Sequence, residues 1–197
     1  MKMRNSILMM VLLSNQAALG QVRKGFEEYY TVSGATFSCL SAKVFYQSRL
    51  GWYSETRFNY EEEGTAACSV GKTFSKEGRL SCSFTPEIGF TAGKLHGVSF
   101  GLNTALSFKQ LSFTSSTLYT TNSFFTWSEL NGQITKQLYA GVTLQLSSSR
   151  CMALKQDAGL QFGFLIKRWT FPLYVFEQGD AHPYFVTGAC YEWKNRP

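Results

Sequence analysis

The sequence predicts an all-β fold, a transmembrane antiparallel up-and-down β-barrel of about 10 strands, with 8 or 12 as alternatives. Three observations predict this fold: an export signal at the N-terminus, a strict two-residue alternation of apolar and polar side chains, and long strands. The expected strands average about 11 residues, which matches the roughly 9–11 residues that a tilted strand needs to cross a bilayer.

The N-terminus has the pattern of a cleaved secretory signal. Two basic residues precede the apolar run 7–13, and the small residues Ala18 and Gly20 stand at positions −3 and −1 of a cleavage site before Gln21. The run is shorter than the ~20 residues of a membrane-spanning helix. We therefore expect residues 1–20 to be removed, and N-terminal sequencing of the exported protein would show Gln21.

The segment 97–108 shows the alternation clearly, with Phe100 and Leu102 on one face and Ser99 and Asn103 on the other. A period of two with one apolar face indicates a β-strand. Strands are expected near 50–60, 65–75, 79–90, 97–108, 110–120, 122–130, 136–147, 157–166, 169–176 and 183–193.

The two faces of these strands predict which side chains meet lipid and which meet the lumen, because a membrane barrel is apolar outside and polar inside. The residues expected to face lipid are Phe100, Leu102, Leu144, Phe162 and Phe164. The charges expected to form a lumen network are Glu55, Arg57, Arg79, Glu87, Glu129 and Glu192.

Glu55 and Arg57 share a face and lie about 7 Å apart along their strand. This spacing is long for a direct pair, so each is expected also to find a partner on a neighbouring strand, with Glu129 as a candidate for part of that network. Two interpretations remain open: a network that fills the lumen, and a narrow charge-lined path.

The connections indicate the topology. Glu61–Gly64, Thr91–His96, Thr121, Ser148–Gln156 and Glu177–His182 are expected at one end, and Ser75–Gly78, Lys109, Asn131–Thr135 and Lys167–Arg168 at the other. The expected domains are the signal 1–20, a periplasmic or partly strand-like segment 21–41, the barrel 42–193 and a tail 194–197. Strand-like stretches within 26–47 make twelve strands possible.

Composition excludes several classes. Charged residues make up 16% of the chain and aromatic residues another 16%, which argues against disorder and against a coiled coil. The five cysteines form no CxxC pair, which argues against a zinc knuckle. No cofactor and no metal are expected. No nucleic-acid partner is expected either, because no dense Lys/Arg cluster is present.

Three stretches resemble an uncharacterised family of outer-membrane β-barrel proteins of Bacteroidota-type Gram-negative bacteria. They are Tyr46–Glu61, Phe124–Leu130 and Lys167–Tyr174. The resemblance covers roughly 42–193 and implies a barrel and an outer-membrane location without an activity. The last strand, Gly188–Trp193, resembles the C-terminal signal of such barrels. The expected partners are therefore outer-membrane lipid and the outer-membrane insertion machinery, with the ligand unknown.

The leading functional interpretation is an integral outer-membrane barrel, not an enzyme, with a structural, adhesive or narrow small-solute channel role. One alternative is a membrane-embedded hydrolase that uses a loop histidine, His96 or His182. Another is a soluble, secreted, lipocalin-like barrel, which would bury the leucine and phenylalanine faces instead. The run Glu61–Glu63 is interpreted as a solvated acidic loop, with calcium binding as the alternative.

Overall fold

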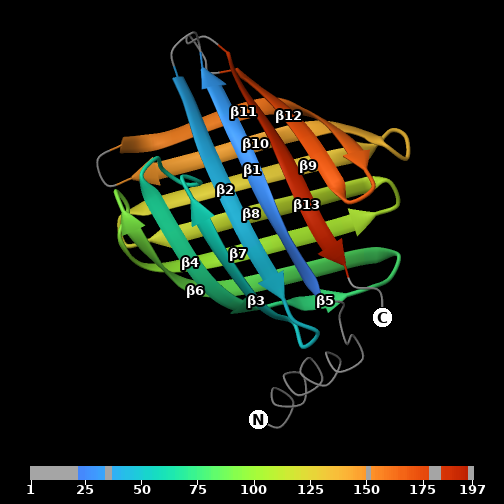
Figure 1. Ribbon diagram of the computed structural model, residues 1–197, viewed down its shortest axis with the longest axis horizontal. Helices are drawn as coiled ribbons and strands as arrows, with labels where there is room; N and C mark the ends of the chain where they lie inside the picture. Colours follow the sequence, from blue (N-terminus) through green and yellow to red (C-terminus); the bar gives the residue numbers. More distant parts are fainter. Residues whose placement is uncertain (1–21, 34–36, 150–151, 178–182, 195–197) are drawn as a thin grey trace, which may run out of the picture.

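A computed structural model describes residues 22–33, 37–149, 152–177 and 183–194. These residues form one antiparallel sheet that closes on itself through pairing of β4 with β6 and of β1 with β13. In Figure 1, the strands β1, β2 and β13 cross in front of the more distant strands β7 to β10, and the start of β1 and the end of β13 lie at the same end of the barrel, called here the termini end. Closure pairs both long edges of the sheet, as a membrane requires.

The first half of the wall consists of β1 (Arg23–Ser33), β2 (Phe37–Gln47), β3 (Trp52–Phe58), β4 (Thr65–Lys72), β5 (Phe74–Lys76) and β6 (Leu80–Gly93). The second half consists of β7 (Gly97–Phe108), β8 (Leu111–Thr120), β9 (Ser123–Gln133), β10 (Leu138–Ser149), β11 (Met152–Ile166), β12 (Trp169–Glu177) and β13 (Tyr184–Lys194). The short β5 pairs with β6 just beyond β4 and shares its position in the wall, so twelve strands form the closed ring.

The main prediction of ten strands was wrong, and the twelve-strand alternative is confirmed. The two additional strands are β1 and β2, so the barrel starts at Arg23 and not at residue 42. Charged residues break the apolar alternation of these strands: Glu27 and Glu28 lie on opposite faces of β1, and Lys43 lies on β2. Both strands nevertheless pair with their neighbours along most of their length, which shows that β1 and β2 belong to the barrel wall.

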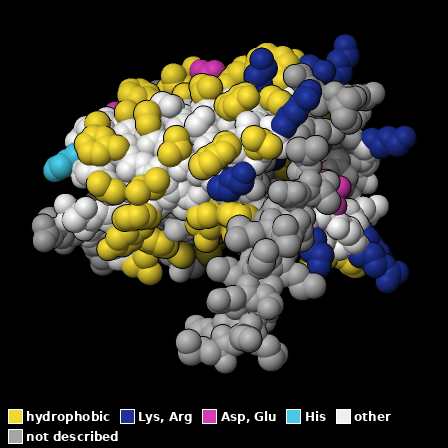
Figure 2. Space-filling model, turned by 90° about the horizontal axis from the view of Figure 1, so that it is seen from below, with side chains coloured by type: hydrophobic (Ala, Val, Ile, Leu, Met, Phe, Trp, Pro, Cys, Tyr) yellow, Lys and Arg dark blue, Asp and Glu magenta, His cyan; other side chains and the backbone are white. Residues whose placement is uncertain are grey.

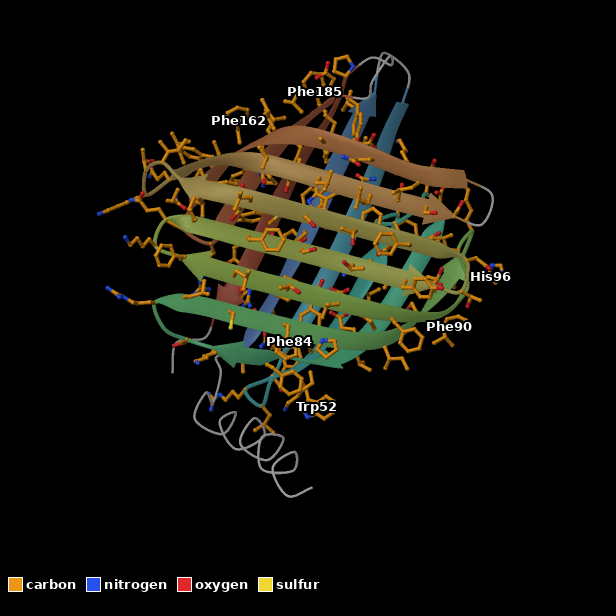
Figure 3. All side chains as sticks on the ribbon, turned by 180° about the vertical axis from the view of Figure 1, so that it is seen from behind. Trp52, Phe84, Phe90, His96, Phe162 and Phe185 are labelled. Atoms are coloured by element: carbon orange, nitrogen blue, oxygen red, sulfur yellow. The ribbon has the colours of Figure 1, made fainter. Side chains whose placement is uncertain are left out.

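The outer surface carries a broad apolar band. Phe100 is 56% exposed, Leu102 44% and Phe162 49%, and all three project away from the lumen. Figure 2 shows hydrophobic side chains spread over the flank of the barrel, and Figure 3 shows Trp52, Phe162 and Phe185 pointing outward from different strands. A lipocalin-like barrel would bury these side chains, so this arrangement favours a membrane barrel.

Basic side chains gather toward the end that holds the termini (Figure 2). By their positions at strand ends and turns they are Arg23, Lys24, Arg49, Lys72, Lys76, Arg79, Lys109, Lys136, Lys167 and Arg168. The left-handed backbone of Lys109 (φ 53°) and Lys167 (φ 57°) forms two tight turns here. Long basic side chains of this kind can place their charge in the headgroup region while their stems cover apolar surface.

In the described residues, no helix is both long and apolar enough to span a membrane.

Candidate functional site

The centre of the lumen is organised by Arg57, whose side chain is only 2% exposed. Its guanidinium lies 2.5 Å from the Glu55 carboxylate and 3.0 Å from that of Glu61. It also donates a hydrogen bond of 2.8 Å to Ser116, a residue on β8. Because β3 and β8 are not neighbours in the sheet, this contact links two separated parts of the wall across the lumen.

Arg57 contacts Glu55 directly, although the spacing of two residues on one face of a strand is long for such a pair. Both side chains are long enough to span the separation of their Cα atoms along β3. Other strands add polar partners to the pair instead of the expected Glu129: Asn103 on β7 and Ser116 on β8 accept hydrogen bonds from Arg57. Glu87 on β6 lies beside them and accepts hydrogen bonds from Ser69 and from Asn103.

The connection 59–64 between β3 and β4 folds into the barrel. Asn59 adopts the left-handed conformation (φ 52°), its amide donates to Leu40, and its side-chain oxygen accepts from the Gly64 amide. Arg57 then holds the Glu61 side chain, which is 1% exposed. Burial raises the pKa of the Glu61 carboxyl, while the positive charge of Arg57 opposes this rise.

Tyr60, which this connection carries inward, lies beside the ring of Tyr29, which in turn lies beside the ring of Tyr174. We call Tyr29, Tyr60, Trp127 and Tyr174 the aromatic belt. The ring centroids of Tyr29 and Tyr60 lie 6.1 Å apart, and those of Trp127 and Tyr174 lie 5.1 Å apart in an edge-to-face arrangement. The Tyr29 ring can reach its position because it crosses Gly188, where a Cβ would approach the ring to 2.6 Å.

The belt separates two cavities that both touch Tyr29, Tyr60 and Trp127. The outer cavity, about 390 Å³, lies on the side of the 59–64 connection and is also lined by Glu61, Lys155 and other residues. The inner cavity, about 270 Å³, lies toward the termini and is lined by residues such as Glu27 and Lys43. The lumen is thus open at both sides of a narrow aromatic centre.

Carboxylates outnumber cations along this lumen. Lys43 forms an ion pair with Glu27 at 2.8 Å, and Arg57 forms ion pairs with both Glu55 and Glu61. The remaining lumen carboxylates depend mainly on neutral donors or lie near the mouths. They are Glu87, bound by Ser69 and Asn103; Glu129, bound by Trp127, Asn131, Gln161 and Tyr174; and Asp157, bound by Tyr184 and by the half-exposed Lys155.

The structure brings together only part of the network expected from the sequence. Glu55, Arg57 and Glu87 lie in one cluster, whereas Glu129 forms a separate cluster with the belt residues Trp127 and Tyr174. Arg79 does not belong to the lumen, because it lies exposed in the turn between β5 and β6. Glu192 lies at the termini end and binds Arg23 at 2.5 Å.

The residues expected to face lipid lie on the outer face as a group. Phe164 is 38% exposed, and Leu144, which is partly covered by its neighbours, shares its strand face with the exposed Val142. Sequence reasoning missed Glu27, Lys43 and the aromatic belt. The alternation of Tyr29 and Trp127 with their strand neighbours could have placed both side chains in the lumen. Tyr60 instead lies in the connection 59–64, where side chains do not alternate, so no periodic signal could have predicted its inward position.

The enzymatic alternative receives no support from the described residues. His96 is exposed on the connection between β6 and β7, at the end opposite the termini (Figure 3), and His182 lies outside the described residues. No group of His, Cys, Asp or Glu side chains in the described ranges is arranged to hold a metal ion. The described cysteines Cys39, Cys68, Cys82 and Cys190 are free thiols, and Cys151 lies outside the described residues.

Comparison with known proteins identifies the fold. No family model matches the sequence, and the search of curated proteins found no relative. Among solved structures, the KdgM porin superposes with a TM-score of 0.61 at 11% identity, covering 85% of this chain and 98% of the porin. The NanC porin superposes with a TM-score of 0.55 at 9% identity, covering 85% and 98%. KdgM is also known in complex with disordered oligogalacturonate, with a TM-score of 0.61 at 10% identity, covering 86% and 98%. The closed barrel, its apolar outer band and these neighbours indicate an outer-membrane protein.

Proposed function

We propose that this protein is an outer-membrane channel for small solutes, in which the aromatic belt limits passage and the carboxylates favour neutral or cationic solutes. The observation that carries this proposal is the pair of polar cavities that meet at Tyr29, Tyr60 and Trp127. A barrel that served only as a structural element would need no polar cavity on both sides of such a constriction.

The charge of the lumen argues against a solute like the oligogalacturonate found in complex with KdgM. Oligogalacturonate is a polyanion, because each of its sugar units carries a carboxylate. Glu55, Glu87 and Glu129 project into the lumen of this barrel, and neutral groups supply most of the contacts to the last two. A channel lined by one sign of charge concentrates ions of the opposite sign. We therefore propose no acidic sugar as the solute.

We further propose that the chain belongs to the Bacteroidota-type barrel family suggested by its sequence, and that its partners are outer-membrane lipid and the insertion machinery. The strand that would carry the insertion signal, β13, closes the barrel against β1. Removal of 188–193 should therefore prevent both insertion and closure, measured as loss of the folded, heat-sensitive band on a gel.

The channel proposal predicts cation selectivity. In a planar bilayer with a potassium chloride gradient, the wild-type barrel should show small conductance steps and a reversal potential of the sign that cation passage produces. The reason is the excess of carboxylates over Lys43 and Arg57 along the lumen. Anion selectivity would contradict the electrostatic part of the proposal.

Removing the central ring should enlarge the path. Tyr60→Ala is expected to raise the single-channel conductance severalfold, because Tyr60 touches both cavities and no described hydrogen bond holds its hydroxyl. Tyr119→Ala is the matched control, since it removes the same side chain from the outer face, where Tyr119 is 54% exposed. If neither the wild type nor Tyr60→Ala conducts, the lumen is sealed and the barrel has a structural role.

A further inference from the structure

The outer face of the barrel carries a group of touching aromatic rings where β12, β13 and β1 meet at the termini end. The ring of Tyr191 lies 4.7 Å from that of Trp169 and 4.1 Å from that of Trp193, measured between centroids. Phe26 lies 5.7 Å from Trp169, and Phe171 stacks on Trp169 at 6.0 Å. We call these five residues the seam cluster. Phe171 is 41% exposed and Trp193 36%, so the cluster faces outward, and such rings favour the headgroup level of a membrane.

Three basic residues border the seam cluster, and all three are exposed. Lys24 is directly opposite Trp193 in the register of β1 and β13, and its ammonium nitrogen lies 5.8 Å from the centroid of the Trp193 ring. Lys167 and Arg168 form the turn that precedes Trp169 at the start of β12. Within the described part of the chain, no carboxylate lies at ion-pair distance from any of these three cations.

The carboxylates on β1 and β13 do not neutralise these cations. Glu27 and Glu192 lie on the inner face of the wall and form ion pairs there. Glu28 faces outward, but it lies four residues farther along β1 than Lys24 and accepts a hydrogen bond of 3.3 Å from the Tyr30 hydroxyl. The outer face of the seam therefore combines positive charge at the end of the barrel with aromatic surface directly beside it.

We propose that this seam is a binding site for an anionic phospholipid, whose phosphate meets Lys24, Lys167 and Arg168 and whose acyl chains cover the seam cluster. Charge complementarity selects the headgroup, because ammonium and guanidinium groups form strong, charge-assisted hydrogen bonds with phosphate. The outward rings select a lipid over a soluble anion, because only a lipid also supplies apolar chains to cover them. The site lies outside the lumen and does not depend on passage of a solute through it.

Native mass spectrometry of the folded, detergent-solubilised barrel tests this site. The probes are dioleoylphosphatidylglycerol and dioleoylphosphatidylcholine in equal amounts, since these lipids have the same acyl chains and differ in the net charge of the headgroup. One basic residue near a membrane surface favours anionic lipid by about fivefold, so three should make the barrel retain the anionic lipid at least about tenfold better. Equal retention of both lipids, or retention of neither, would overturn the proposal.

Two matched triple variants locate the site on the barrel. The first replaces the three cations of the seam by glutamine and should lose most of the preference for the anionic lipid: Lys24→Gln, Lys167→Gln and Arg168→Gln. The second removes two exposed lysines and one exposed arginine from the same end but from the opposite side of the ring, and should keep the preference: Lys76→Gln, Lys109→Gln and Arg79→Gln. An equal loss in both variants would show that the attraction is spread around the whole end, without a site at the seam.

A pair of tryptophan variants tests the aromatic part of the site. Trp169→Leu should weaken retention of the anionic lipid severalfold, because it removes the ring that contacts Phe26, Phe171 and Tyr191. Trp52→Leu is the control, since Trp52 is 59% exposed at the start of β3, away from the seam. The folded state of every variant is checked by its heat-sensitive migration on a gel. A loss for Trp169→Leu no larger than for Trp52→Leu would exclude the seam cluster from the site.

Discussion

Arg57→Ala should lower the free energy of unfolding by about 3–5 kcal/mol, the cost of breaking a buried ion pair from one side. The substitution leaves the carboxylates of Glu55 and Glu61 without their shared cation, and the side chains of all three residues are at most 2% exposed. It also removes the hydrogen bond to Ser116 that spans the lumen. Most of this loss in stability comes from the two carboxylates left without a cation, since a buried charge without a partner is costly.

Reversible urea unfolding of the barrel in lipid vesicles measures this loss. The double variant Arg57→Ala with Glu55→Gln should lose less stability than Arg57→Ala alone, because one stranded charge is removed together with the cation. Arg79→Ala serves as the control, since this arginine lies exposed in the turn between β5 and β6. A loss for Arg57→Ala no larger than for Arg79→Ala would show that the lumen at this depth is fully hydrated.

Leu102→Arg should destabilise the barrel by about 2–4 kcal/mol, because it places a charge on the lipid face near the middle of the membrane. Leu102 lies near the centre of β7, is 44% exposed and points away from the lumen. The same unfolding measurement applies. The expected cost is specific to depth, so Leu111→Arg, at the start of β8 beside a turn, should cost only about 0–1 kcal/mol.

Thr114→Arg provides the matched change on the inner face. Thr114 lines the inner cavity and is directly opposite Glu129 in the register of β8 and β9. An arginine there would have both room and a carboxylate partner, so its cost should be small compared with that of Leu102→Arg. Equal losses for both substitutions would contradict the assignment of lipid and lumen faces.

The sequence by itself determined ten of the twelve strands that close the barrel, the facing of most of their side chains and the ends at which their connections lie. This was possible because side-chain facing in a strand is local: alternation along β7, for example, places Phe100 and Asn103 on opposite faces whatever the rest of the chain does. The shared inward face of Glu55 and Arg57 followed from the same period of two. The signals at both ends of the chain pointed to export and to an outer-membrane barrel on equally local grounds.

The tertiary structure alone decided the number of strands and the form of the lumen. The wall closes at twelve because β1 pairs with both β2 and β13, and a pairing partner distant in the chain leaves no periodic trace in β1 itself. The aromatic belt likewise joins Tyr29, Tyr60 and Trp127 from parts of the chain that only closure brings together. Arg57 pulls the connection 59–64 inward through Glu61, and this contact depends on side-chain reach and burial, which alternation of apolar and polar residues cannot express.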